Sequence, residues 1–255
     1  MKTVRSIAAL RKELAGRSGA LGLVPTMGAL HTGHLALIDA ARSECDTIVV
    51  SLFVNPAQFD EAADLAAYPR DEERDAALAA DAGVDVLFAP EPGEIYPAGF
   101  QTWVDVEELS RGLEGAYRPG HFRGVATICL KLFNIVRPQF AYFGQKDAQQ
   151  IAVIRRMVRD LDLDLTVRSV PTVRDSDGLA ISSRNVLLSE AEREAALALP
   201  RALSTRDPAA ARAALDGLDV DYVEIADFDP PVLAAAVRVG STRLIDNVIL
   251  NEEER

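Results

Sequence analysis

The 255-residue sequence contains few cysteines and histidines and no long hydrophobic run. The two cysteines, Cys45 and Cys129, stand singly in apolar or helical surroundings, and their spacing indicates neither a disulfide framework nor a zinc site. The first residues lack the apolar core of a signal peptide, and no run is long enough to span a membrane. We therefore expect a protein of the reducing cytoplasm with no membrane partner and no metal-ligating set of its own.

Basic residues are scarce relative to acidic ones. The chain has 27 Lys and Arg against 39 Asp and Glu, which gives a formal net charge of -12. Nucleic-acid binding draws on clustered Lys and Arg, so we expect no nucleic-acid partner. A small anionic substrate needs only a few local cations and is not excluded. The charged segment 60–75, DEAADLAAYPRDEERD, has a helical pattern and is predicted to be a solvated surface.

Apolar runs alternate with helical patterns over much of the chain, and an apolar content of 49% is enough for a core. Residues 1–16 are predicted to form a short amphipathic helix. Strands are predicted at 20–26, 47–54, 84–90, 139–144 and 165–174, and helices at 33–44, 72–83, 124–136 and 147–161. This alternation indicates the α/β class: a Rossmann-like parallel sheet with helices on both faces.

The composition changes after about Val173, which predicts a first domain over 1–172 and a second over 173–255. Ser189 is followed by Glu192 three positions later, the pattern of a capping box at a helix start. Strands are predicted at 219–228 and 241–250. The expected order of one helix, then strand, helix and strand indicates a small α+β domain.

Two histidines stand where the first long strand leads into a helix, in the stretch PTMGALHTGH. In an open α/β sheet, ligands bind at the carboxyl ends of the strands, and a helix N-terminus favours a phosphate. His31 and His34 are three residues apart and share a face of the helix start, where both can donate to phosphate oxygens. The pair can also simply cap the helix or bind a metal.

Other polar residues follow later strands. Asn55 and Gln58 lie in FVNPAQF, where their amides suit a polyol or carboxylate, although Asn-Pro is also ordinary turn chemistry. Lys146 in FGQKDAQQ can neutralise growing phosphate charge or be a solvated surface cation. Segment 182–184, Ser-Ser-Arg, can hold a phosphate or form a polar turn.

These stretches together resemble one known family. PTMGALHTGH, SLFVNPAQF, YPRD, EIYP, LEGAYRPGHFRGV, FGQKDAQQ and DGLAISSRN occur in this order over most of residues 20–190. HTGH resembles the HxGH signature of the nucleotidyltransferase superfamily, and the ordered set resembles the pantothenate synthetases, which are pantoate–β-alanine ligases. The resemblance implies ATP-dependent condensation of pantoate with β-alanine through a pantoyl adenylate, Mg²⁺ accompanying ATP, and a homodimer.

The resemblance also implies roles for individual residues. Four are expected to be catalytic: His34, His31, Lys146 and Arg184, with His34 as the proton donor. The expected ATP-binding set adds Met27, Gly28, Ala29, Leu30, Thr32, Gly33, Gly144, Gln145, Asp147, Val173, Ile181, Ser182 and Ser183. Asp147 can also be a helix N-cap, and Met27 can be ordinary core filling. The expected substrate-binding residues are Gln58, Gln150 and Asn55.

Three residues of the loop YRPGHFRG, Arg118, His121 and Arg123, are given no individual role. The part after Asn185 is shorter than the resemblance leads us to expect, and the small second domain is expected to act as a lid. Two rival hypotheses are an HxGH enzyme that moves AMP onto a phosphate ester and a protein of this fold that has lost catalysis. The first rival requires a basic pocket, whereas Gln58 and Gln150 offer neutral amides.

Overall fold

The computed structural model describes residues 1–59, 62–251 and 254, and it divides into two compact units. The first unit comprises Met1–Phe143 and Val153–Val170, and the second comprises Gly144–Ala152 and Pro171–Arg255. The change of unit at Pro171 lies close to the predicted domain boundary at 172. The sequence did not indicate that Gly144–Ala152 belongs with the C-terminal part.

A six-stranded sheet forms the centre of the first unit, with the order β1-β4-β3-β2-β5-β6. Its strands are β1 (Lys2–Val4), β2 (Leu21–Thr26), β3 (Thr47–Leu52), β4 (Val86–Phe88), β5 (Phe140–Gly144) and β6 (Thr166–Val170). β2 pairs in parallel with both β3 and β5, so the strand order reverses at β2. The predicted parallel sheet is therefore confirmed. β6 ends before Pro171, which has no N–H to donate to a ladder.

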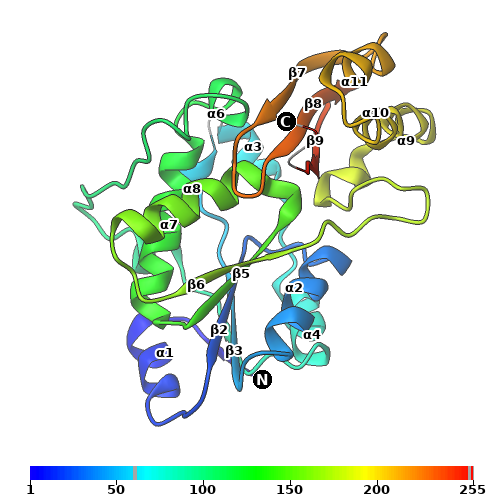
Figure 1. Cartoon of the computed structure of the whole chain (residues 1–255). Coiled ribbons are helices and arrows are strands. Elements are labelled where there is room, and N and C mark those ends of the chain that lie inside the picture. Colours follow the sequence, from blue (N-terminus) through cyan, green and yellow to red (C-terminus); the bar gives the residue numbers. More distant parts are fainter. Residues whose placement is uncertain (60–61, 252–253, 255) are drawn as a thin grey trace. The chain divides into compact units, whose positions relative to one another are not determined.

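Helices cover both faces of this sheet, as the sequence predicted (Figure 1). Those of the first unit include α1 (Ile7–Leu14), α2 (Thr32–Arg42), α3 (Ala62–Ala67), α4 (Glu72–Asp81), α5 (Pro92–Ile95), α6 (Glu114–Tyr117) and α7 (His121–Val136), and α8 (Ala148–Asp160) begins in the second unit. A buried cluster joins α2 and α4 to the sheet through Ile38, Ala79 and Val50. α1 packs with α7 on the opposite face.

The N-terminal prediction is wrong in part, because residues 1–16 do not form one helix. Lys2–Val4 form strand β1, which pairs in parallel with Val86–Phe88 at the sheet edge. The helix begins only after Ser6, whose hydroxyl oxygen accepts from the Ala9 N–H at 3.2 Å. The three-residue strand has no strong sequence signal of its own, since its partner β4 lies more than 80 residues away.

The second unit packs three helices against a three-stranded antiparallel sheet. The helices are α9 (Glu190–Ala196), α10 (Ala198–Leu203) and α11 (Pro208–Ala214), and the strands are β7 (Asp219–Ala226), β8 (Val232–Val239) and β9 (Thr242–Ile249). The predicted capping box is confirmed: the Ser189 N–H donates to Glu192 Oε2 at 2.8 Å. Leu199, Leu233 and Leu244 belong to the core between helices and sheet.

The helix predicted between the last two strands is wrong, because Val232–Val239 form the central strand β8. The segment VLAAAVRV is rich in alanine, a strong helix former. β8 pairs with β7 over Val232–Arg238 on one side and with β9 over Val232–Val239 on the other. These ladders, together with burial of most of its side chains, outweigh the local preference of the alanines.

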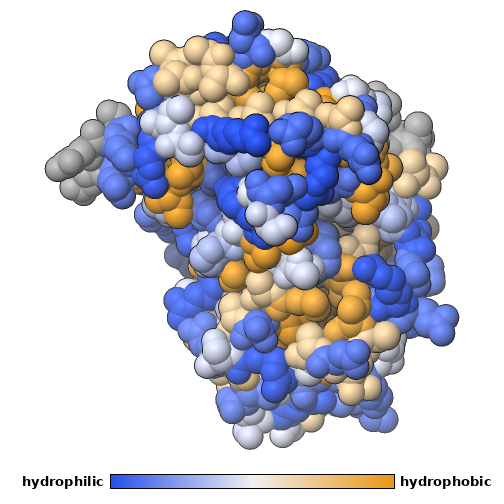
Figure 2. All heavy atoms as spheres, turned by 90° about the vertical axis from the view of Figure 1, so that its right-hand side faces the viewer, coloured by the Kyte–Doolittle hydropathy of each residue, from blue (hydrophilic) through white to orange (hydrophobic). Residues whose placement is uncertain are grey.

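No helix in the described part of the chain is long and apolar enough to cross a membrane. Figure 2 shows a face covered mainly by hydrophilic residues, with hydrophobic residues in separate patches. Such scattered apolar exposure is usual for a folded protein surface.

Candidate active site

The first part of the site is the corner between β2 and α2. Thr26 ends β2, and its hydroxyl donates to the Ser51 carbonyl of β3 at 2.7 Å. Gly28 and Ala29 then turn the chain with φ of 89° and 51°, in the left-handed region. This conformation suits glycine and is unusual for alanine, so the corner needs support from its surroundings.

A buried carboxylate gives that support. Asp75 of α4 is 1% exposed, and its two oxygens accept from the backbone N–H groups of Ala29 at 2.8 Å and Leu30 at 2.7 Å. A Cβ on Gly28 would lie 3.0 Å from Asp75 Oδ2 and 2.9 Å from a Leu52 methyl. The carboxylate therefore fits tightly against the turn that leads to the histidines.

The sequence missed this role, since it placed Asp75 on a solvated surface. That prediction is wrong for Asp75 but suits the exposed start of α4, where Asp71 accepts from the Arg74 N–H at 3.0 Å. The available signal was helical spacing: Asp75 and the apolar Ala79 are four residues apart, and both are buried on one face of α4.

The two histidines cap α2 reciprocally. His31 Nδ1 accepts from the Gly33 N–H at 3.1 Å, and the His31 N–H points to His34 Nδ1 at 3.4 Å. Because a nitrogen that accepts carries no proton, an imidazole bound in this way holds its proton on Nε2 when it is neutral. Capping and phosphate donation were alternatives in the sequence analysis. The geometry makes them compatible, since capping uses Nδ1 and leaves Nε2 as the donor atom.

The protonation state of His34 follows from its surroundings. Burial, together with the neighbouring His31 ring, lowers the pKa of His34 to about 3. The ring centroids of the two histidines are 4.1 Å apart. A positive charge on a desolvated ring is unfavourable, so His34 is neutral at physiological pH.

Asn55 and Gln58 lie after β3, the neighbour of β2. Asn55 is fully buried, and its Nδ2 donates to Gln58 Oε1 at 2.8 Å and to the Gly124 carbonyl at 3.1 Å. Its Oδ1 accepts from the Tyr96 hydroxyl at 2.8 Å. Asn55 also caps the short 3-10 helix η1 (Pro56–Gln58), so the turn chemistry expected of Asn-Pro is present. Its bond to Gln58 Oε1 fixes that amide with Nε2 as a donor.

Arg118, just before α7, and His121, the first residue of α7, hold the Gln58 carbonyl. Arg118 Nη1 lies 3.2 Å from His121 Nε2, and since arginine only donates, this histidine nitrogen accepts. His121 Nδ1 then donates to the Gln58 carbonyl at 3.1 Å. Arg123 instead stands over the Trp103 ring, 5.0 Å from its centroid. Arg118 and His121, to which the sequence gave no role, thus hold the backbone of Gln58.

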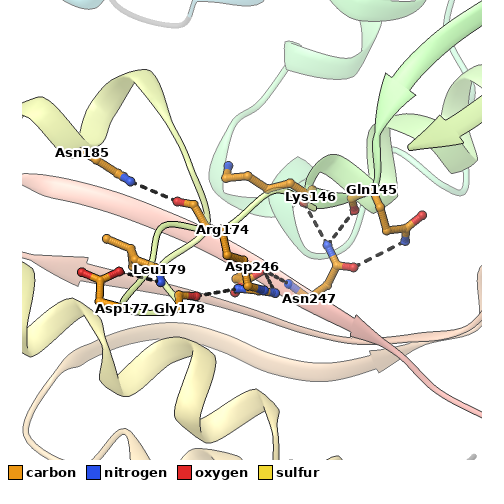
Figure 3. Close-up of polar contacts among 10 residues, drawn as sticks. Gln145, Lys146, Arg174, Asp177, Gly178, Leu179, Asn185, Asp246 and Asn247 are labelled. Atoms are coloured by element: carbon orange, nitrogen blue, oxygen red, sulfur yellow. Dashed lines mark hydrogen bonds and ion pairs between the residues drawn. The ribbon is translucent and has the colours of Figure 1, made fainter. Parts of the chain in front are cut away.

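The Lys146 segment, residues 144–150, belongs to the second unit. Gly144 ends β5 and precedes the 3-10 helix η2 (Gln145–Asp147), and Gln150 lies in the first turn of α8. Lys146 and Gln150 are half-buried. The side chain of Asn247 on β9 contacts the backbone of this segment, and Lys146 extends away from it (Figure 3).

The second unit also holds segment 173–184 in a compact turn. Val173 accepts from the Ile181 N–H at 3.0 Å, and Arg174 and Ala180 form an antiparallel bridge. Ser182 caps the 3-10 helix η3 (Ser183–Leu187) by accepting from the Arg184 N–H at 3.2 Å. The hydroxyl of Ser182 therefore has a structural partner in addition to any ligand.

The structure gathers the predicted residues in two sets, one in each unit. The first unit holds Met27–His34 together with Asn55 and Gln58, after the adjacent strands β2 and β3. The second holds Gly144–Asp147, Gln150 and Val173–Arg184. Among the described residues, no group of three or more His, Cys, Asp or Glu could hold a metal ion.

Comparison with known proteins identifies the family. The model of the family described as pantoate-beta-alanine ligase matches residues 1–249. The chain belongs to the pantoate–β-alanine ligase family. A pantothenate synthetase of Heliobacterium modesticaldum is 52% identical over 276 aligned residues, covering 98% of each chain, and one of Pelotomaculum thermopropionicum is 50% identical with the same coverage. The alignment with the Heliobacterium protein has 276 positions, whereas this chain has 255 residues. The Heliobacterium protein therefore contains segments that this chain lacks.

Solved structures of the pantoate–β-alanine ligase family agree. Pantothenate synthetase from Thermus thermophilus superposes with a TM-score of 0.93 at 46% identity, covering 98% of this chain and 99% of the other. The ligase from Francisella tularensis, described as complexed with beta-gamma ATP and beta-alanine, gives a TM-score of 0.87 at 35% identity and covers 98% and 97%. Both matches extend over the two units, so the overall family assignment applies to the whole chain.

The support of the β2–α2 corner predicts the effect of removing Asp75. Asp75→Ala leaves two backbone N–H groups without an acceptor, so the free energy of unfolding should fall by about 2–4 kcal/mol. Hydrogen exchange at Ala29 and Leu30 should accelerate. Asp71→Ala, at the exposed start of the same helix, should cost about 1 kcal/mol as an ordinary cap loss and leave exchange at the corner unchanged. Equal exchange at the corner in all three proteins would contradict the role of Asp75.

The lowered pKa of His34 predicts its titration. Because the folded pKa of about 3 lies below the ordinary value of 6.5, the His34 contribution to stability is present above pH 6.5 and declines as the pH falls toward 3. The chain has only three histidines, so NMR can follow each ring. The His34 ring should stay neutral with its proton on Nε2 from pH 8 to 5, and His34→Gln assigns its signal. A midpoint near 6.5 would rule out the proposed environment.

Proposed function

We propose that the chain catalyses the ATP-dependent condensation of pantoate with β-alanine, through a pantoyl adenylate, with release of AMP and pyrophosphate. The observation that carries this proposal is the β2–α2 corner, where His31 and His34 are both held through Nδ1 and the neutral ring of His34 keeps its proton on Nε2. Family membership over residues 1–249 gives the substrate class.

The first step activates the carboxylate of pantoate. One carboxylate oxygen attacks the α-phosphorus of ATP, the bond from that phosphorus to the bridging oxygen of pyrophosphate breaks, and pyrophosphate leaves. Phosphoryl-type transfer depends mainly on positioning and charge stabilisation, so no protein nucleophile is required. We assign His34 and His31 to donate from Nε2 to phosphate oxygens on which negative charge grows.

The remaining charge stabilisation is assigned to residues of the second unit. We assign Lys146 and Arg184 to neutralise α- and β-phosphate charge and Ser182 and Ser183 to orient the departing pyrophosphate. Ile181 and Val173 lie in the same turn and are assigned to the nucleotide. These groups belong to one compact unit, so any motion of that unit as a lid would carry them together.

The second step forms the amide. The free amine of β-alanine attacks the acyl carbon, a C–N bond forms, and the bond to the AMP oxygen breaks, after which the amine loses its proton. Gln58 and Gln150 are assigned to hold the hydroxyls and carboxylate of pantoate, with Asn55 fixing Gln58. A neutral amide pair suits this polyol acid better than a second phosphate ester, which would require cations.

Mg²⁺ is assigned to the bound ATP and not to a protein cage. The described residues contain no cluster of metal-ligating side chains, and Mg²⁺ is commonly held through phosphate oxygens and water. The proposal also includes a homodimer in the cytoplasm. Cys45 and Cys129 are free thiols in the structure, which suits a reducing compartment.

Isotope exchange tests the function directly. The protein is mixed with ATP and labelled pyrophosphate, alone, with pantoate or with phosphopantetheine. Exchange that requires pantoate, followed by AMP formation when β-alanine is added, is the expected result, because the first step is reversible and precedes the amine. Exchange only with phosphopantetheine would favour transfer of AMP to a phosphate ester, and no exchange under any condition would indicate lost catalysis.

Replacement of His34 tests the donor role. His34→Ala should lower turnover by about a hundredfold or more, the scale for losing one preorganised donor to a transition state. Asp39→Ala, on the exposed side of the same helix, should keep the parental rate. A His34→Ala protein that folds and turns over at nearly the parental rate would refute this assignment.

A further inference from the structure

Two neighbouring residues of β9, Asp246 and Asn247, are buried and polar in an otherwise mainly apolar strand. Asp246 is 2% exposed and Asn247 is 5% exposed. Successive side chains of a strand point to opposite faces of the sheet. Asp246 therefore shares a face with Leu244 and Val248, which pack in the helix-covered core, and Asn247 lies on the other face.

Asn247 holds the backbone of the Lys146 segment. Its Nδ2 donates to the carbonyl oxygens of Gln145 and Lys146, both at 2.9 Å, and its Oδ1 faces Gln145 Nε2 at 3.4 Å (Figure 3). The two carbonyls belong to a single turn of 3-10 helix. Fixing both carbonyls fixes the position from which the Lys146 side chain extends.

Asp246 holds the other nucleotide segment. Its carboxylate pairs in a bidentate manner with Arg174, at 2.6 and 3.0 Å, and Arg174 also donates to the Gly178 carbonyl at 3.2 Å (Figure 3). Arg174 opens the turn whose far side, Ala180, accepts from the Asn185 side chain at 3.0 Å. The turn that leads into residues 182–184 is thus anchored to β9.

We propose that Asp246 and Asn247 are positioning residues that fix the Lys146 segment and the Arg174–Arg184 segment relative to each other through one strand. The two segments are far apart in the sequence, whereas their anchors are adjacent. Buried polar groups cost stability unless they are paired, and valine or isoleucine would serve an ordinary core strand. The inference rests on the proposed function, because it is that function that gives Lys146 and Arg184 their task.

The main test is a double-mutant cycle on the full chain. Asn247→Ala removes three hydrogen bonds to the Lys146 segment, two of them to its backbone, and should lower pantoate-dependent pyrophosphate exchange about tenfold. In a Lys146→Ala background the same change should lower the residual rate less than about twofold, since its target is gone. A loss of equal size in both backgrounds, or full activity of folded Asn247→Ala, would overturn the proposal.

The partner residue has a matching cycle. Asp246→Asn keeps the shape of the side chain but removes the charge that faces Arg174, and it should also lower the exchange rate about tenfold. This loss should shrink to less than about twofold in an Arg184→Ala background. A purely structural role would give the same loss with and without Arg184.

Controls separate positioning from general damage to the sheet. Thr242→Ala truncates a buried polar residue at the far end of β9, about 17 Å from Asn247 at the usual rise per strand residue, and should keep the parental rate. Thermal unfolding is measured for every variant. Should Asn247→Ala fail to fold, Asn247→Ser retains one donor and should give an intermediate loss of about threefold, with full activity counting against the proposal.

Direct binding of ATP separates this inference from the proposed function. Absence of pantoate-dependent exchange in the parental protein would refute the function. Calorimetric titration with ATP still tests the positioning role of Asn247 in that case. We expect the affinity for ATP to be about tenfold lower in Asn247→Ala and unchanged in Thr242→Ala. Equal affinity for ATP in the parental protein and Asn247→Ala would overturn the proposed positioning role, whichever reaction the protein catalyses.

Discussion

Each of the two sets of predicted site residues depends on one constraint: backbone groups that leave a strand ladder must find other partners when they are buried. The β2–α2 corner satisfies two N–H groups with the carboxylate of Asp75. The turn around Gln58 satisfies its carbonyl with His121, and the Lys146 segment satisfies two carbonyls with Asn247. In each case a side chain from a distant element holds the backbone, which leaves the side chains of the segment itself for ligands.

The histidine pair shows how one residue can serve both structure and chemistry. A helix start leaves N–H groups without partners, and serine or aspartate usually accepts from them. Here the imidazoles of His31 and His34 take that role through Nδ1. An imidazole has a second nitrogen, so capping through Nδ1 fixes the tautomer and leaves Nε2 as a donor, whereas an ionised aspartate cap has no proton to donate. The low pKa of His34 keeps that ring neutral over the physiological range.

The sequence predicts the parts of the fold that have local signals. The buried strands, the amphipathic helices and the Ser189 capping box are confirmed, and so is the family. Local signals are misleading where pairing decides: Lys2–Val4 become a strand because β4 offers an edge, and the alanines of Val232–Val239 become a strand between two ladders. The supporting residues Asp75, His121 and Asn247 were not predicted. Their partners are backbone groups far away in the chain, and a side chain that binds backbone leaves no motif in the sequence of its partner.

The energetic cost of burying polar groups explains why the supporting residues are so well paired. A carboxylate or amide in the interior is unfavourable by itself, and a partly satisfied one is worse than an apolar residue of the same shape. Asp75 and Asn247 each meet two backbone groups, and Asp246 meets a bidentate arginine, so the desolvation is offset in every case. An apolar replacement could restore the packing but would leave the backbone groups unpaired. Stability of the local turn and position of the functional side chain therefore depend on the same bonds, and selection for either preserves both.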